Sequence, residues 1–187
     1  MKSNKSLLLG VILTLTGISA KADYSLQIAT TTTGTSPNAV FDVGGLTKVD
    51  NTFFGQIKVN GTFLANVFNF GQNGATVLPG LNGYLSAGTI NVTSATLFGG
   101  SSATVQLFAF QGGATYDAAS VTPGAKIGNS VSPITVTLGG LNQAADNTFN
   151  VPNLATMSGF TVAAVPEPAT LALGLFGAAG LFIRRRK

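Results

Sequence analysis

Few side chains in this sequence can take part in acid–base, nucleophilic or metal chemistry. The 187 residues contain no histidine and no cysteine. Ser-His-Asp and Cys-His nucleophile systems, zinc sites and histidine general bases are therefore excluded. Disulfide bonds are excluded too, so packing and hydrogen bonds alone must hold the fold together.

The carboxylates available for chemistry in the central part of the chain are five aspartates: Asp23, Asp42, Asp50, Asp117 and Asp146. Glycoside cleavage needs only two carboxylates, but none of the five lies in a recognisable catalytic pattern, and Asp117 is interpreted as a loop residue. A calcium loop needs oxygen ligands at alternate positions, and no Asp-x-Asp pattern occurs. No Gly-Lys-Ser/Thr phosphate-binding motif is present either. The sequence thus predicts no catalytic residue, no metal site and no cofactor.

The formal net charge of +4 would suit a nucleic-acid partner if the basic residues shared one surface. They lie at the two ends instead: Lys2, Lys5 and Lys21 near the start, and Arg184, Arg185, Arg186 and Lys187 at the finish. Between residues 23 and 164, three lysines stand against five aspartates, which gives a net charge of −2. We therefore expect no nucleic-acid partner.

The N-terminal segment has the pattern of a secretory signal peptide. Lys2 and Lys5 precede an apolar stretch at residues 7–18, and Ala20-Lys21-Ala22 follows. Small residues three and one before the cut are what a signal peptidase accepts, so Asp23 is the predicted mature N-terminus. The alternative, a first strand or helix of the fold, lacks the caps and turn residues that would frame it.

The C-terminal segment has the pattern of a short membrane span. Pro166 and Pro168 interrupt regular structure, and residues 169–183 contain Thr170 as the sole polar side chain. As a helix these residues reach about 22 Å, short of the roughly 30 Å hydrocarbon layer. The basic cluster at residues 184–187 is typical of a stop-transfer signal and predicts that the preceding domain faces outward. The alternative is an amphipathic surface helix or a buried core helix.

The order Val165-Pro166-Glu167-Pro168-Ala169-Thr170, then a Gly/Ala/Leu-rich span, then arginines, resembles the PEP-CTERM sorting signal of Gram-negative bacteria. The resemblance covers about 25 of the 187 residues. It implies that exosortase, a membrane-embedded enzyme, cleaves near Pro166, Glu167 and Pro168 and passes the domain from the inner membrane to the cell surface or the extracellular polysaccharide. The chain is then a substrate. The alternative is a plain linker to a permanent anchor.

The central region has the composition of strands and turns, being rich in Thr, Val, Phe, Gly and Asn. Asn60-Gly61 between residues 52–59 and 62–70 predicts a type I′ hairpin, because both turn positions favour positive φ. Further strands are expected at residues 24–31, 39–43, 84–93, 103–110, 134–138 and 159–164. The spacing predicts an antiparallel β-sandwich, jelly-roll or Ig-like, with the phenylalanines in its core.

The chain is thus expected to divide into a signal peptide (1–22), an extracellular β-sandwich (23–164) and a sorting tail with a short transmembrane helix (165–187). One internal similarity lies within the sandwich: Gly44-Gly45-Leu46 with Asp50-Asn51-Thr52-Phe53 recurs at residues 139–141 and 146–149. We interpret the two copies as similar turns, in which Asp or Asn caps its own backbone, rather than as a calcium or sugar site.

Three functions fit these observations. The leading hypothesis is a non-enzymatic structural protein of the cell surface or the extracellular polysaccharide. The alternative is a carbohydrate-binding module, which would need an exposed aromatic platform; with no tryptophan, it would have to use Tyr24, Tyr84, Tyr116 and stray phenylalanines. The third is a glycan-active enzyme with two catalytic aspartates.

Overall fold

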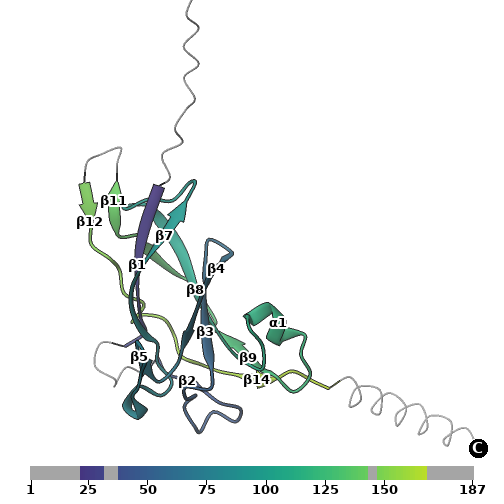
Figure 1. Cartoon of the computed structure of the whole chain (residues 1–187). Helices are drawn as coiled ribbons and strands as arrows, with labels where there is room; N and C mark the ends of the chain where they lie inside the picture. The colour runs from purple at the N-terminus through teal and green to yellow at the C-terminus, as the bar shows by residue number, and fades with distance from the viewer. Residues whose placement is uncertain (1–21, 32–37, 143–146, 168–187) are drawn as a thin grey trace, which may run out of the picture.

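The computed structural model describes residues 22–31, 38–142 and 147–167, where almost all regular structure is β-strand (Figure 1). The predicted all-β class is therefore confirmed. Within these ranges, no helix combines the length and the apolar character needed to cross a bilayer. The predicted membrane helix at residues 169–183 and most of the predicted signal peptide lie outside the described residues.

The first sheet has four strands in the order β1-β7-β5-β6. Their bounds are Ala22–Ala29 (β1), Ser86–Ser94 (β7), Gln72–Asn73 (β5) and Thr76–Val77 (β6). β1 and β7 pair antiparallel along almost their whole length, whereas β5 joins β7 in parallel at Asn73 and Ser86. The expectation of a purely antiparallel arrangement is therefore wrong at this point.

The second sheet has six strands, with β14-β9-β8-β3-β4 in order and β10 paired with the first part of β8. Their bounds are Ala163–Ala164 (β14), Lys126–Asn129 (β9), Ser102–Gln111 (β8), Phe54–Val59 (β3), Thr62–Asn69 (β4) and Ile134–Thr137 (β10). All pairs in this sheet are antiparallel. β8 is the longest strand and holds β3 on one side and β9 and β10 on the other.

The hairpin between β3 and β4 turns where the sequence predicts it. Asn60 has a φ of 46° and Gly61 a φ of 81°, the positive values that a type I′ turn requires. Further along β4 the register shifts, since Gln56 lies opposite Val67 while Lys58 lies opposite Phe63. β4 therefore carries a bulge at residues 64–66, and the buried Gln56 side chain fills it by donating from Nε2 to the carbonyl oxygen of Leu64 at 2.9 Å.

Two short strands lie where the sequence predicts strands: β2 (Val40–Phe41) within residues 39–43 and β13 (Phe160–Thr161) within residues 159–164, although their parallel pairing was not expected. Other short elements were not expected from the sequence: the pair β11 (Gly140–Asn142) and β12 (Asn147–Phe149), the 3-10 helix η1 (Pro79–Leu81) and the helix α1 (Tyr116–Ser120). The two similar sequence segments also differ: residues 51 and 52 form a turn, whereas residues 147–149 form a strand. The interpretation as two similar turns is therefore wrong for the second copy.

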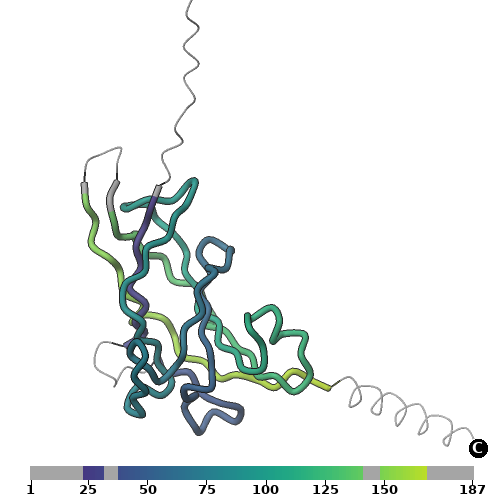
Figure 2. The backbone as a smooth tube through the Cα atoms, viewed as in Figure 1, coloured from purple at the N-terminus to yellow at the C-terminus, as the bar shows by residue number. Residues whose placement is uncertain are grey.

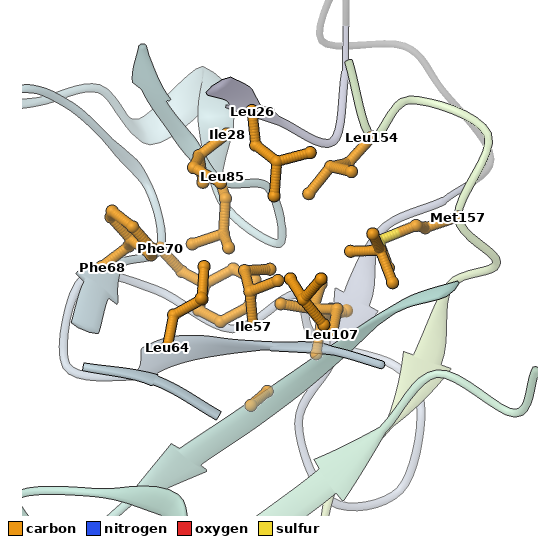
Figure 3. Packing of buried hydrophobic residues seen from close by; sticks show 14 of the residues in the cluster. Leu26, Ile28, Ile57, Leu64, Phe68, Phe70, Leu85, Leu107, Leu154 and Met157 are labelled. Atoms are coloured by element: carbon orange, nitrogen blue, oxygen red, sulfur yellow. The ribbon is translucent and has the colours of Figure 1, made fainter. Parts of the chain in front are cut away.

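One hydrophobic core lies between the two sheets (Figure 3). Leu26, Ile28 and Leu85 approach it from the first sheet side, and Ile57 and Leu107 from the second. Leu154 and Met157, both almost fully buried, close it from the segment after β12. Six phenylalanines are buried, at positions 53, 68, 70, 108, 110 and 160, so their predicted structural role is confirmed.

The sheets are joined on one side and open on the other. Ser25 of β1 exchanges two backbone hydrogen bonds with Gly139, which directly follows β10 and Leu138. On the opposite side, no strand in the described ranges pairs with the outer edge of β4, or with β7 on the side away from β1 between Gly88 and Ser94. On this open side, two strand edges therefore remain unpaired in the described ranges.

Candidate functional site

The folded body meets the Pro-Glu-Pro triplet at β14, an edge strand. Ala163 and Ala164 pair with Ile127 and Lys126 of β9. Val165 continues this pairing: its amide donates to Ala125 O at 2.7 Å, and its carbonyl accepts from Gly124 N at 3.0 Å. Figure 2 shows this C-terminal segment, in yellow, ending beside the turn after α1 and far from the start of β1. Pro166 and Glu167 follow at once, and both are exposed.

A small apolar cluster holds the side chain of Val165. It is formed by the buried residues Phe110, Ala119 and Ala125, with Val165 and Tyr116 packed against them. Ala119 is presented by α1, which begins at Thr115, whose hydroxyl accepts a hydrogen bond from Ala118 N at 3.3 Å, a typical N-cap. The junction is therefore fixed both by backbone hydrogen bonds and by packing.

An ion pair ties the same corner to β2. Lys126 Nζ lies 2.8 Å from Asp42 Oδ2, with both side chains about 30% exposed. Burial by itself would raise the pKa of Asp42, but the hydrogen bonds from Lys126 and from the Val43 amide outweigh it and hold the pKa below its ordinary value. The Asp42 carboxyl is thus ionised at neutral pH, and its contact with Lys126 fixes the loop after β2 against β9, the neighbour of β14.

The predicted processing residues are distributed between the described and the undescribed parts of the chain. Of the sorting triplet, Pro166 and Glu167 are described, and neither forms a hydrogen bond within the described ranges. Pro168, the basic cluster at residues 184–187 and Ala20 lie outside those ranges. Ala22 begins β1 opposite Ser94, and Asp23 lies opposite Thr93. A cut after Ala22 would therefore leave β1 complete from Asp23 onward.

Asp42 and Asp50 are near enough for the charge of one to act on the other, but no larger acidic group forms in the described ranges. Asp50 Oδ1 accepts hydrogen bonds from Thr52 Oγ1 at 2.6 Å and Thr52 N at 3.0 Å, which lower its pKa and confirm the predicted capped turn. Asp117 lies in the first turn of α1, so its interpretation as a loop residue is wrong. Asp146 lies outside the described residues. In the ranges the structure describes, no three acidic side chains come together in a way that could hold a metal ion.

The tyrosines do not form a platform. Tyr24 and Tyr84 are 3% and 1% exposed, and Tyr116 is half-buried with its ring edge-on to Phe108 at a centroid distance of 4.7 Å. Lys58 covers the neighbouring Phe63, its Nζ lying 4.3 Å from the ring centroid. The described part of the chain therefore lacks the exposed row of rings that a stacking carbohydrate-binding module needs.

Comparison with known proteins identifies the C-terminal end. Residues 164–187 match the family described as the PEP-CTERM protein-sorting motif. The match begins at Ala164, the last residue of β14, and so starts inside the folded body. No curated protein and no solved structure matches the chain.

Proposed function

We propose that this chain, which carries a PEP-CTERM protein-sorting motif and is thus an exported protein sorted by exosortase, is a non-enzymatic structural protein of the cell surface or the extracellular polysaccharide. One observation carries the proposal. The described hydrogen bonds and core contacts of the body reach Val165, directly before the triplet, and none of them uses Pro166 or Glu167. A cut at the triplet would therefore leave all of these described contacts intact, which is what a transient sorting tag requires.

The proposed route has three steps. Signal peptidase removes residues 1–22, recognising Ala20 and Ala22. The domain then stands in the periplasm while the apolar residues 169–183 and the basic residues 184–187 hold the chain in the inner membrane. Exosortase finally cleaves near Pro166, Glu167 and Pro168. The prolines support this assignment because they keep the triplet extended and prevent it from extending the strand pairing of β14.

The non-enzymatic role is supported by the way the carboxylates are used. Asp42 is engaged by Lys126, and Asp50 caps its own turn. Asp117 is exposed on α1 and belongs to no described group of three or more acidic side chains. We propose that the two sheets act as a sandwich scaffold whose surface, rich in Thr, Ser and Asn, makes hydrogen bonds in the matrix.

The proposal is tested by the intact mass of the protein in three fractions: washed membranes, sheared surface material and medium. In cells with exosortase, we expect the surface form and the medium form to lack the residues after about Pro166. We also expect digestion of the polysaccharide to release the surface form into the soluble fraction. In cells without exosortase, we expect a membrane-bound form that retains Lys187. A surface form with Lys187 in normal cells would contradict cleavage, and a processed form indifferent to polysaccharide digestion would contradict the matrix role.

A further inference from the structure

A groove of about 460 Å³ lies between the two unpaired strand edges. The hairpin end of β4 forms one wall, with Thr62 and Leu64, and the end of β7 with the following loop forms the other, with Val92, Thr93 and Thr96. The volume is within the range of small-ligand sites in proteins.

Tyr24 is the unusual residue in the lining of this groove. Its side chain is 97% buried, since its relative exposure is 3%, and burial raises the pKa of its phenol. Nevertheless, its hydroxyl forms no hydrogen bond with any described residue. No side-chain oxygen or nitrogen that is sealed from solvent in the described ranges lacks a partner, so the Tyr24 hydroxyl is open to solvent although most of the residue is buried. Because Tyr24 lines the groove, its hydroxyl is available to a partner that enters there.

The rest of the lining defines the chemistry of that partner. None of the described residues around the groove is charged, so an ionised group would enter without a counter-charge. Thr62, Thr93 and Thr96 are exposed and contribute hydroxyl groups that both donate and accept. Val92 and Leu97 add half-buried apolar surface. The lining thus suits a neutral molecule with many hydroxyl groups and some C–H surface.

A peptide strand fits the groove less well than such a molecule. Strand addition needs a regular row of free backbone groups along the edge. The bulge at residues 64–66 interrupts that row on β4, and the carbonyl oxygen of Leu64 already accepts from Gln56 Nε2. Bulges are a known means of preventing such edge pairing. The β4 edge therefore does not offer a continuous template for another strand.

We propose that the groove between β4 and β7 binds a neutral sugar unit, with the unpaired Tyr24 hydroxyl as one of its hydrogen-bond partners. This inference rests on the proposed function in one respect, the supply of sugar by the extracellular polysaccharide. The site uses hydrogen bonding and edge packing, and needs no exposed aromatic platform.

The test is calorimetric titration of the full-length chain in detergent micelles. The probes are neutral gluco-, galacto- and manno-oligosaccharides of two to six units, uronic-acid oligomers of equal length, and an uncharged alternating Thr/Val hexapeptide. We expect binding of a neutral oligosaccharide, weakened roughly 3- to 10-fold by Tyr24→Phe, as for loss of one hydrogen bond. Thr96→Val should weaken it similarly.

Two matched variants serve as controls. Tyr116→Phe removes a hydroxyl from a tyrosine outside the groove, and Thr135→Val alters an exposed threonine on β10. Neither should change binding. Tyr24→Phe removes a hydroxyl that has no described partner, so its thermal midpoint should match that of the native chain, and Thr96→Val at an exposed position tests the groove independently.

The proposal is overturned if no neutral oligosaccharide binds, if the uronic-acid oligomers or the hexapeptide bind in preference, or if binding ignores both Tyr24→Phe and Thr96→Val. These outcomes are distinct from failure of the sorting proposal, because tail removal is read from intact masses and does not depend on sugar binding.

Discussion

The amide nitrogen of Val165 lies 2.7 Å from the carbonyl oxygen of Ala125, and the carbonyl oxygen of Val165 lies 3.0 Å from the amide nitrogen of Gly124. Within the described ranges, these two hydrogen bonds are the last between the body and the segment that leads to the sorting tail. Pro166 follows directly and cannot donate a backbone hydrogen bond. The body and the processing site therefore meet without a spacer. Under the proposed cleavage at the triplet, the enzyme would therefore work against the face formed by β14, β9 and the turn after α1.

Changing the two prolines of the triplet is the first test of this junction. Pro166→Ala with Pro168→Ala should retain the tail, so that the membrane fraction contains a protein with the mass expected for an intact Lys187. Folding should not change, because Pro166 is exposed and no described core contact uses it. The control is Pro133→Ala, an exposed proline before β10. Normal tail removal in the double variant would contradict the assigned role of the triplet.

The hairpin and the long strands could be predicted from the sequence because local preferences decide them. Asn60 and Gly61 adopt positive φ almost regardless of the surroundings. β9 was not predicted, because Gly128 and Asn129 have low strand propensity. Its strand conformation depends instead on pairing with β8 and β14. The parallel pairing of Phe160 with Val40 joins segments that are far apart in the sequence, so no local sequence pattern predicts it.

The candidate site was likewise predictable only in part. The Pro-Glu-Pro triplet can be recognised from the sequence, whereas the attachment of Val165 depends on contacts with β9 and α1 that only the structure reveals. For α1, Thr115 with Asp117 in the first turn was a usable capping signal, but a five-residue helix in a Gly/Ala-rich stretch has no apolar periodicity. That the Tyr24 hydroxyl has no described hydrogen-bond partner could not be predicted either, because it depends on which residues the tertiary structure places around it.

Gln56 should contribute strongly to stability. Its Nε2 donates to Leu64 O at 2.9 Å, and its Oε1 accepts from Tyr116 N at 3.1 Å, while the side chain is 5% exposed. Gln56→Leu leaves both backbone groups without their partner and should lower the free energy of unfolding by about 2–4 kcal/mol. Gln27→Leu, at an exposed position on β1, should change it by less than about 0.5 kcal/mol. Chemical denaturation compares them, and equal effects would contradict the bridging role of Gln56.

The pKa values of Asp42 and Asp50 are both lowered in the folded chain. A carboxyl whose pKa is lower in the folded state stabilises the fold above its unfolded pKa, and this contribution is lost as the pH falls through the folded pKa. Thermal midpoints should therefore decline below about pH 4. Asp42→Asn should lower the free energy of unfolding near pH 7 by no more than about 1 kcal/mol, since the ion pair is partly exposed. The thermal midpoint at pH 7 should fall accordingly, and its decline at low pH should become less steep. Asp23→Asn, exposed on β1, is the control; an equal effect there would contradict the role of the ion pair.

Val121 should touch the bilayer while the sorting tail still holds the chain. It is 77% exposed and lies three residues before Gly124, which donates a hydrogen bond to Val165. The apolar segment begins at Ala169, and the four residue steps from Val165 span at most about 14 Å when extended. If residues 169–183 hold the chain in the membrane as proposed, we expect the hydrogen bonds between the turn after α1 and Val165 to keep this turn close to the lipid head groups.

A matched pair of variants can measure this approach. The chain contains no tryptophan, so Val121→Trp and Val131→Trp each introduce a single fluorophore. Val131 is 82% exposed but lies in the loop between β9 and β10, at the other end of β9 from the Lys126–Ala164 pair. In full-length chain reconstituted into vesicles, the emission of V121W should shift to shorter wavelength and be quenched by brominated lipid, whereas that of V131W should not. Equal quenching of both, or of neither, would show that the turn after α1 is not the face held against the membrane.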